Sequence, residues 1–506
     1  MRKLVNRLTI TIVLISLQIA AVVFFSITAR TFLPDFVSYI GMAISVVVFL
    51  FIIKGDKASS YKIAWIIIIL LLPIDGGVLY LIAGNKRPAK KIASQMDEHA
   101  LIARLLDEDG NLPFLNQVQC GRMFSLFQYI RNCSSYHAYT NTRVKYYPMG
   151  ELMFEDMLAE LTKAKQFIFI EFFIIKESHM WDRLLEVMEQ KAAEGVDVRL
   201  IVDHLGSYRL FSSRYARKLQ ARGIKVLRFN PFVPYLQLFM NYRDHRKVIV
   251  IDGLVAFNGG INIADEYINK NSRFGVWKDT GVRLEGDAVW SFTLMFIEMW
   301  DTFCKANERI DDYAAYKAPP STLAPDGLVL PYSDSPLDDE ELAENIYVDM
   351  LHQAEKYVYI FTPYLIISEK LSKALQLTAR RGVDVRIITP GIADKKAVHR
   401  LTRSYYRRIL KAGVRVFEYT PGFLHAKSFI VDDEVAFVGT INLDYRSLYL
   451  HFECATLLFR NSAIADIKED FEQTLAESRE FTLAGRKRRI FNELLDAVLH
   501  LFAPLM

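Results

Sequence analysis

Hydrophobic residues follow two different patterns along this 506-residue chain. Up to about residue 85 they form long apolar runs, whereas from about residue 146 onward short apolar runs alternate with amphipathic segments. Long runs are typical of helices in a membrane. Short apolar strands between amphipathic helices are typical of an α/β fold whose sheet is covered on both faces. The pattern therefore predicts an N-terminal α-helical membrane region at residues 1–92, followed by an α/β part.

The apolar runs of the N-terminal region are not equivalent. The first two predict transmembrane helices at about 8–28 and 36–53. The third run, at 63–85, contains Pro73 and a glycine pair that begins at Gly76. These residues break or kink a helix, and each half of the run is then too short to span a bilayer. We therefore expect a re-entrant segment there, with a third membrane helix as the alternative.

Basic residues favour the re-entrant arrangement. They cluster at the N-terminus, at 54–62 and at 86–91. The positive-inside rule places all three clusters on the cytoplasmic side, which requires that the run between the last two turns back. We expect a multi-pass protein of the cytoplasmic membrane whose α/β part lies on the cytoplasmic side.

The α/β part is an internal repeat. Three pairs of segments resemble each other in the same order: 164–175 and 354–367, 194–203 and 381–390, and 221–232 and 411–422. A repeat of about 170 residues has the length of one α/β domain. We predict two tandem domains with mixed sheets flanked by helices, at 146–320 and 321–506, related by a pseudo-twofold axis. A polar connector at 93–145 joins them to the membrane region.

Each copy of the repeat ends in the same set of polar residues. One stretch reads HRKVIVIDGLVAFNGGIN from His245, and the other reads HAKSFIVDDEVAFVGTIN from His425. A lysine two residues after each histidine emerges on the same face of a strand, and a hairpin returns an asparagine beside them. The two sets are His245, Lys247, Asp252 and Asn262, and His425, Lys427, Asp432 and Asn442. Recurrence at identical spacing excludes a chance arrangement of surface residues.

An imidazole, an ammonium group and an amide on one surface suit an anionic phosphate. The lysine and the asparagine can hold non-bridging oxygens and stabilise charge in a transition state. The histidine can act as a nucleophile or as an acid and base near neutral pH. The aspartate lies at the far end of the strand, where a structural role is expected. Because one copy supplies only a nucleophile or only a general acid, the two copies are expected to face each other in one site that requires neither metal nor cofactor.

Composition restricts the partners of this site. The formal net charge is only +4 and 52% of the residues are hydrophobic, so that no strong basic field covers the chain. A nuclease is expected to have a basic groove lined by aromatic residues and has no need of an apolar region at 1–85. We therefore expect a lipid bilayer rather than a nucleic acid as the partner.

The spacing HxKxxxxDxxxxxxGxxN, present twice, resembles the signature of the phospholipase D superfamily. The segments WKDTGVRLEG at 277–286 and NLDYRSLYLHFE at 442–453 are similar to those of bacterial cardiolipin synthases. This resemblance covers nearly the whole chain. It implies a phosphatidyl transfer in which two phosphatidylglycerol molecules give cardiolipin and glycerol through a phosphohistidine. It leaves a homo-oligomer, other phosphatidyl donors and the acyl preference open.

The chain departs from this family at a few positions. The serine that follows the first glycine of the motif is Gly260 in the first copy and Thr440 in the second. Family members also carry a carboxylate that supports a catalytic histidine. Glu453 matches it in the second copy, and Asp279, displaced by an insertion, substitutes for it in the first. His451 stands where these synthases more often have asparagine.

The symmetry of the repeat does not show which of the two histidines is the nucleophile and which is the acid and base. Superfamily precedent favours His245 as the nucleophile and His425 as the acid and base. The alternative function is a membrane-anchored phosphodiesterase of the phospholipase D type that transfers the intermediate to water. A membrane scaffold without activity is a third class, which the two intact motifs disfavour.

Overall fold

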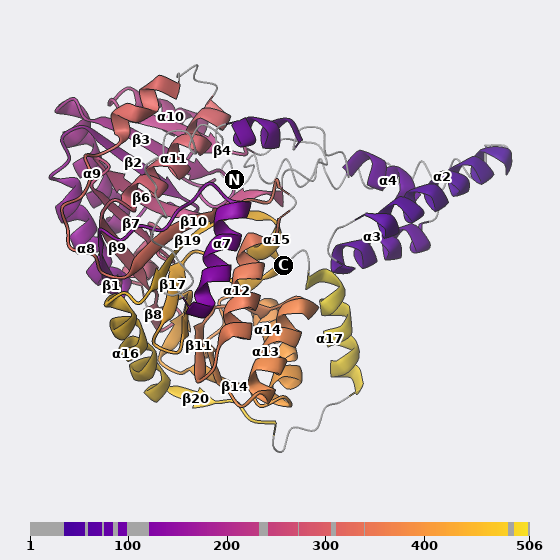
Figure 1. Cartoon of the computed structure of the whole chain (residues 1–506). Coiled ribbons are helices and arrows are strands. Elements are labelled where there is room, and N and C mark those ends of the chain that lie inside the picture. Colours follow the sequence, from indigo (N-terminus) through magenta and orange to yellow (C-terminus); the bar gives the residue numbers. More distant parts are fainter. Residues whose placement is uncertain are drawn as a thin grey trace. The chain divides into compact units, whose positions relative to one another are not determined.

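The structure is a computed structural model of the whole chain (Figure 1). It describes residues 35–55, 59–72, 75–83, 90–98, 121–231, 241–271, 273–304, 310–338, 340–483 and 490–503. These residues divide into an N-terminal unit, which also includes the C-terminal helix, and a catalytic unit. The run at 8–28 lies outside the described residues.

The described residues of the N-terminal unit include four apolar helices. They are α2 (Asp35–Lys54), α3 (Ser59–Leu71), α4 (Asp75–Ala83) and α17 (Ile490–Phe502). Helices α2, α3 and α4 contact one another, and α17 contacts α3. Val48, Ile52 and Ile69 form a small buried cluster. The helix predicted at 36–53 is thus present as α2, but no helix in the described part of the chain is long and apolar enough to cross a membrane.

The glycine pair of the third apolar run does not form the break in the helix; it allows close packing of the helix that follows the break. The run is interrupted between α3 and α4, and Gly76 and Gly77 lie inside α4. A β-carbon on Gly77 would clash with Ser45 of α2, and one on Gly76 would clash with the backbone of Ile69 in α3. The two glycines therefore let α4 approach both neighbours closely, as small residues do at helix interfaces.

The first domain of the catalytic unit is built on a mixed seven-stranded sheet. Its strand order is β1-β9-β7-β6-β2-β3-β4. The strands are β1 (Thr142–Tyr147), β2 (Phe167–Phe172), β3 (Asp197–Asp203), β4 (Lys225–Phe229), β6 (Lys247–Ile251), β7 (Val255–Gly259) and β9 (Gly281–Gly286). Strands β2, β3 and β4 are parallel, and the remaining pairs are antiparallel. The sheet begins at Thr142, inside the segment expected to be a connector.

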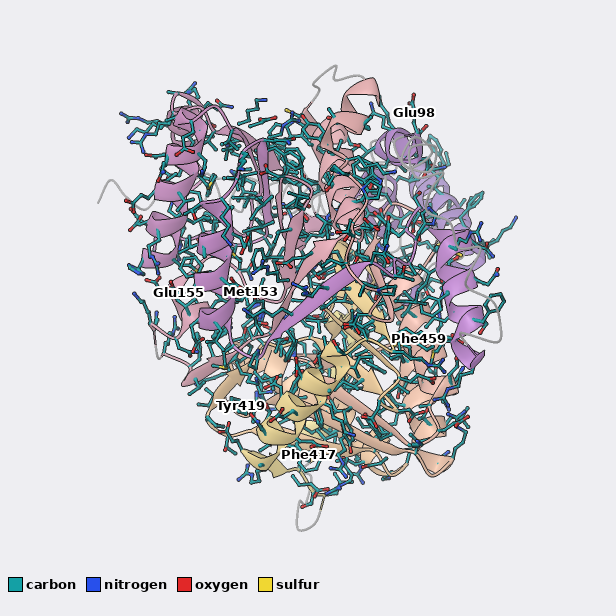
Figure 2. The ribbon with its side chains drawn as sticks, turned by 60° about the vertical axis from the view of Figure 1, so that its left-hand side comes forward. Glu98, Met153, Glu155, Phe417, Tyr419 and Phe459 are labelled. Carbon is teal, nitrogen blue, oxygen red and sulfur yellow. The ribbon has the colours of Figure 1, made fainter. Side chains whose placement is uncertain are left out.

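Helices cover both faces of this sheet. Strand β2 points Ile168 and Ile170 into a core shared with α8 (Gly150–Leu161) and α9 (His179–Ala193). On the opposite face Phe169 stacks on Phe296 of α11 (Val289–Cys304), with ring centroids 4.5 Å apart. Alternation of side chains along a strand explains the two cores. Figure 2 shows the side chains that fill them, including the buried Met153 of α8.

The second domain repeats this arrangement. The order β10-β19-β17-β16-β11-β13-β14 follows that of the first sheet strand for strand, and β20 extends its edge. The strands are β10 (Leu328–Asp334), β11 (Tyr357–Phe361), β13 (Asp384–Pro390), β14 (Arg415–Tyr419), β16 (Ser428–Val431), β17 (Val435–Gly439), β19 (His451–Phe459) and β20 (Ser478–Glu480). Its helices include α12 (Leu342–Gln353), α13 (Glu369–Arg380), α14 (Lys396–Leu410), α15 (Tyr445–Tyr449) and α16 (Ala463–Ala476). The predicted duplication of a mixed α/β domain is confirmed.

Two short strand pairs join the domains reciprocally. Strand β5 (Arg243–Asp244) of the first domain runs parallel to the start of β19 in the second. Strand β15 (Gly422–Leu424) of the second domain runs parallel to β8 (Val276–Lys278) in the first. Each pair ends immediately before a motif histidine, so that both histidines lie where the domains meet.

Candidate active site

The backbone of each motif histidine is bound to the other domain. The N–H of His245 donates to the carbonyl of Phe452 at 2.9 Å, and the N–H of His425 donates to the carbonyl of Lys278 at 2.7 Å. Both imidazoles are buried, with 7% of each residue exposed. The exchanged strands therefore fix both histidines in the interface between the domains.

Each motif lysine lies beside its own histidine. The Nζ of Lys247 donates to the carbonyl oxygen of His245, and the Nζ of Lys427 donates to that of His425. The Nζ of Lys427 is also 2.9 Å from the Nδ1 of His425. The structure thus places histidine and lysine together, as their two-residue spacing predicts.

Arg246, between the two residues of the first motif, points into a different environment. Its Nε lies 2.8 Å from the Oε1 of Glu171, and both side chains are buried. Asp244 completes this cluster, in which the pKa of its carboxyl is raised well above the usual value by burial and by Glu171. The cluster anchors the strand behind the site.

The carboxylates that support the histidines are exchanged between the copies. The Nδ1 of His245 lies 2.8 Å and 3.0 Å from the two carboxylate oxygens of Glu453. The Nδ1 of His425 lies 2.6 Å from the Oδ2 of Asp279. Glu453 and Asp279 each follow the residue whose carbonyl binds the other copy's histidine. The sequence places one carboxylate in each copy, but because of the strand exchange each carboxylate contacts the histidine of the other copy.

The departure at Gly260 has a steric cause. In the second copy the Thr440 hydroxyl donates to Glu453, which holds that carboxylate in place. In the first copy a β-carbon on Gly260 would clash with the carboxylate of Asp279. The shorter aspartate occupies the space of the missing side chain. Thr440 therefore contacts the carboxylate that supports His245.

The motif aspartates bind backbone rather than the site. Asp252 accepts hydrogen bonds from the N–H groups of residues 165–167, and Asp432 accepts them from residues 355–357, all at 2.7–2.8 Å. Both adopt left-handed backbone conformations, with φ of 52° and 56°. Each carboxylate therefore fixes the start of the neighbouring strand, the structural role expected from its position.

The motif asparagines differ in their contacts. Asn262 accepts from the N–H of Ile174 at 3.0 Å and donates to the Tyr267 hydroxyl at 2.9 Å. Tyr267 in turn makes an edge contact with His425, with ring centroids 5.5 Å apart. Asn442 is buried, and its Oδ1 has no hydrogen-bond partner among the described residues. The Asn262 amide thus positions a ring beside the opposite histidine.

Burial lowers the pKa values of all four basic side chains of the two motifs, and positively charged neighbours add to this for His245, His425 and Lys427. Burial, and then the charges of Lys247 and Lys427, lower the pKa of His245 well below its usual value. Burial and Lys427 lower the pKa of His425 to about 4, against the opposing effect of Asp279. Burial lowers the pKa of Lys247 to about 8 and that of Lys427 to about 7. An anionic phosphate entering the site would relieve this mutual repulsion.

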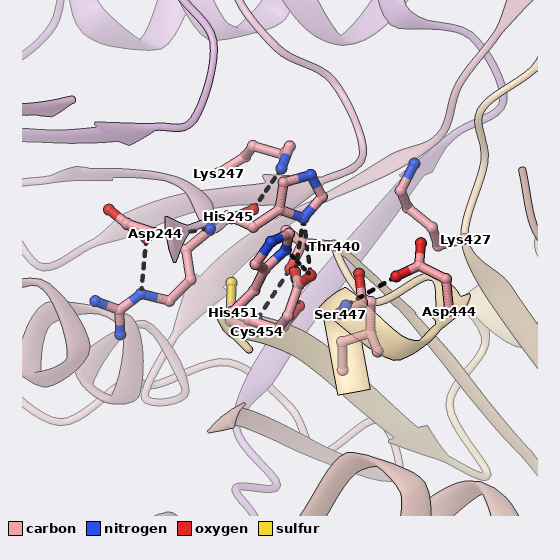
Figure 3. Close-up of polar contacts among 12 residues, drawn as sticks. Asp244, His245, Lys247, Lys427, Thr440, Asp444, Ser447, His451 and Cys454 are labelled. Atoms are coloured by element: carbon pink, nitrogen blue, oxygen red, sulfur yellow. Dashed lines mark hydrogen bonds and ion pairs between the residues drawn. The ribbon is translucent and has the colours of Figure 1, made fainter. Parts of the chain in front are cut away.

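His451 gives the first histidine an additional neighbour. Its ring centroid lies 5.3 Å from that of His245, and its Nδ1 lies 3.7 Å from the Oε1 of Glu453. Figure 3 shows His451 beside the contacts of His245, with Thr440 close by. Ligand atoms of His245, His451 and Glu453 all lie within 4.8 Å of one another. This geometry could hold a metal ion, although the sequence predicted no metal site.

Aromatic rings surround both histidines. Phe173 lies 4.9 Å from His245, and Trp277 lies 5.4 Å from His425, between ring centroids. Sequence reasoning did not select Phe173, Tyr267 or Trp277, because aromatic residues in a core carry no distinguishing signal. The position of Trp277 two residues before Asp279 was the available hint.

The fold, the paired motifs and the exchanged carboxylates define a phospholipase D-like protein. A family model described as cardiolipin synthase, PLD-like domain, matches residues 157–282 and 347–475. A second model, for the phospholipase D-nuclease N-terminal region, matches residues 43–85. The chain belongs to the cardiolipin synthase family of the phospholipase D superfamily, as its motifs predicted.

Relatives match over nearly the full chain. A cardiolipin synthase 1 of Bacillus cereus is 31% identical over 95% of each chain, and a cardiolipin synthase of Halalkalibacterium halodurans is 32% identical over 92% of each. An uncharacterized protein of Streptococcus mutans is 45% identical over 90% of this chain and 99% of its own. The crystal structure of a phosphatidylserine synthase from Haemophilus influenzae shares the fold, with a TM-score of 0.54, 15% identity, and coverage of 72% of this chain and 93% of its own.

Proposed function

We propose that this chain is a phosphatidyltransferase that converts two phosphatidylglycerol molecules into cardiolipin and glycerol through a phosphohistidine. One observation carries the proposal. Two buried histidines, each with a lysine beside it, are bound through Nδ1 to a carboxylate of the opposite copy. The names of the Bacillus cereus and Halalkalibacterium halodurans relatives support the same substrate class.

In the first half-reaction His245 attacks the phosphorus of one phosphatidylglycerol. Its Nδ1 proton is held by Glu453, so that the lone pair lies on Nε2. The P–Nε2 bond forms while the P–O bond to the glycerol headgroup breaks. Protonated His425 donates its proton to the departing glycerol oxygen. The ammonium groups of Lys247 and Lys427 stabilise the charge on the non-bridging oxygens.

In the second half-reaction the acceptor is a glycerol hydroxyl of another phosphatidylglycerol. Neutral His425 removes the proton of this hydroxyl, and the oxygen attacks the phosphohistidine. The new P–O bond forms as the P–N bond breaks, which releases cardiolipin and neutral His245. Asp279 stabilises the imidazolium form of His425 in both half-reactions.

The test uses purified full-length protein with phosphatidylglycerol as the sole lipid. We expect cardiolipin and glycerol in equal amounts and no product from His245→Ala. Phosphatidic acid without cardiolipin would instead identify a hydrolase. If neither the wild type nor the variant forms a product, the protein lacks this activity.

We also propose that the N-terminal unit associates with the cytoplasmic membrane and keeps the catalytic domains on the cytoplasmic side. Large apolar side chains of α2 are exposed, including Phe36 at 62%, Tyr39 at 71% and Phe51 at 69%. Exposed apolar surface of this kind signifies contact with another apolar phase. Cell fractionation with alkaline extraction tests the association, and protease treatment of spheroplasts tests the side. Extraction into the soluble fraction, or cleavage from outside, would contradict the proposal.

A further inference from the structure

The two histidines differ in their ability to bind a metal. Two residues before Glu453 lies His451, and two residues before Asp279 lies Trp277. The two rings occupy corresponding places, with centroids 5.3 Å from His245 and 5.4 Å from His425. An indole offers no lone pair to a cation, whereas an imidazole is a preferred ligand of zinc. Among the residues that the structure describes, the group of possible metal ligands therefore lies in the first half of the site.

We propose that His245, His451 and Glu453 form a binding site for a zinc ion, and that zinc bound there inhibits the enzyme. Two imidazoles and one carboxylate are a ligand set that zinc uses in enzymes, with the fourth position open to water or substrate. The inhibitory part of this inference rests on the proposed function of His245, whereas the binding part does not.

The separations of the ligand atoms fit a tetrahedral ion. Ligands at about 2.1 Å from zinc lie about 3.4 Å from one another. The Oε1 of Glu453 is 2.8 Å from the Nδ1 of His245 and 3.7 Å from the Nδ1 of His451. The three ligand atoms need shifts of only a few tenths of an ångström to about one ångström, since all lie within 4.8 Å.

Two further observations point to a ligand beside these three residues. His451 is 8% exposed, and neither of its ring nitrogens has a hydrogen-bond partner within the part of the chain that the structure describes. Buried polar atoms without a partner are costly, and a cation would satisfy one of them. The Thr440 hydroxyl donates to the Oε2 of Glu453. It orients the carboxylate and leaves Oε1 for the metal, as supporting hydrogen bonds do in metal sites.

Zinc at this site would suppress the nucleophile through its tautomer. Catalysis requires the proton of His245 on Nδ1, facing Glu453, and the lone pair on Nε2. Zinc coordinated by Nδ1 takes the lone pair of that nitrogen, so that the single proton of the neutral imidazole lies on Nε2. The atom that must attack phosphorus is then protonated, because the proton that Nδ1 gave up has been transferred to Nε2 and the neutral imidazole keeps one proton.

The test measures binding and inhibition separately on the full-length protein, freed of metal by a chelator. Zinc is titrated against a chromophoric chelator, and cobalt is added to follow the visible absorption of a coordinated ion. We expect one zinc per chain. His451→Asn and Glu453→Gln should each weaken binding by about 10-fold or more and diminish the cobalt absorption. The matched control is His179→Asn, which removes an exposed histidine of the first domain and should bind as the wild type does.

Inhibition is measured for each variant relative to its own metal-free rate. We expect His451→Asn to raise the zinc concentration for half-inhibition by the same factor by which it weakens binding, and a chelator to restore wild-type activity. Absence of bound zinc in the wild type, or unchanged affinity in both His451→Asn and Glu453→Gln, would overturn the site. Zinc binding in a protein that makes no cardiolipin when metal-free would leave the site intact and reject the proposed function.

Discussion

The two halves of the active site share a backbone frame but surround their histidines differently. His245 is supported by the long carboxylate of Glu453, which Thr440 holds from behind. His425 is supported by the shorter Asp279, which lies against Gly260 where a side chain would clash. Each half thus has a carboxylate at the Nδ1 of its histidine, but different neighbouring residues hold that carboxylate in place. Duplication preserved the charge and its position while the supporting residues diverged, and divergence of this kind permits one half to become the nucleophile and the other the acid.

The largest effect should come from the histidines themselves, and it can separate their roles. His245→Asn and His425→Asn should each reduce cardiolipin synthesis by about 10⁴-fold or more, the scale seen when a nucleophile or its proton-transfer partner is removed. A phosphatidyl ester of p-nitrophenol needs no general acid, because its leaving group departs as an anion. With this substrate His425→Asn should accumulate a radiolabelled phosphatidyl-enzyme, whereas His245→Asn should not. Accumulation in His245→Asn alone would reverse the assignment.

The exchange of carboxylates should produce the next largest effect. Glu453→Gln should slow formation of the phosphatidyl-enzyme from the p-nitrophenyl ester by about 10²- to 10⁴-fold, because the His245 tautomer is no longer held. Asp279→Asn should leave this step nearly unchanged and slow only the reaction with phosphatidylglycerol, where the acid is needed. Rapid-quench measurement of the labelled enzyme distinguishes the two. If Asp279→Asn slowed the p-nitrophenyl step and Glu453→Gln did not, each carboxylate would act within its own copy.

The lysines should titrate at different pH values in the two halves. Both must be charged to attract phosphate, and burial lowers the pKa of Lys427 to about 7 and that of Lys247 to about 8. Since a lysine loses its charge above its pKa, kcat/KM should fall as pH rises through 7, and more steeply above 8, by up to about tenfold per pH unit for each group.

Arginine variants sharpen this comparison, since a guanidinium stays charged over the whole range. Lys427→Arg should remove the limb near pH 7 and leave the one near pH 8, at a lower maximal rate. Lys247→Arg should remove the limb near pH 8 and leave the one near pH 7. An unchanged profile in both variants would show that another group sets the alkaline limb.

The sequence predicts the residues of each motif well, but it does not predict which residues of the other domain they contact. The pairing of His245 with Lys247, and the structural role of Asp252, follow from spacing along one strand and recur in both copies. The contact of His245 with Glu453 depends on a strand pair only two residues long between the domains. Such a pair leaves no periodic signal. The same limit applies to the third apolar run, where Gly76 and Gly77 looked like helix breakers and proved to be points of close helix packing.

The smallest effect should come from the residues behind the carboxylates. Thr440→Ala removes one hydrogen bond to Glu453 and should lower kcat for cardiolipin synthesis by about 10- to 150-fold, as expected for a lost bond to a charged group. Thr440→Ser keeps the hydroxyl and is the matched control. The second half offers the opposite experiment, because Gly260→Ala adds a β-carbon that collides with Asp279. It should slow the step that needs His425 while sparing the p-nitrophenyl ester, whereas Thr440→Ala should slow both substrates. Identical behaviour of the two variants would mean that the supporting residues do not discriminate nucleophile from acid.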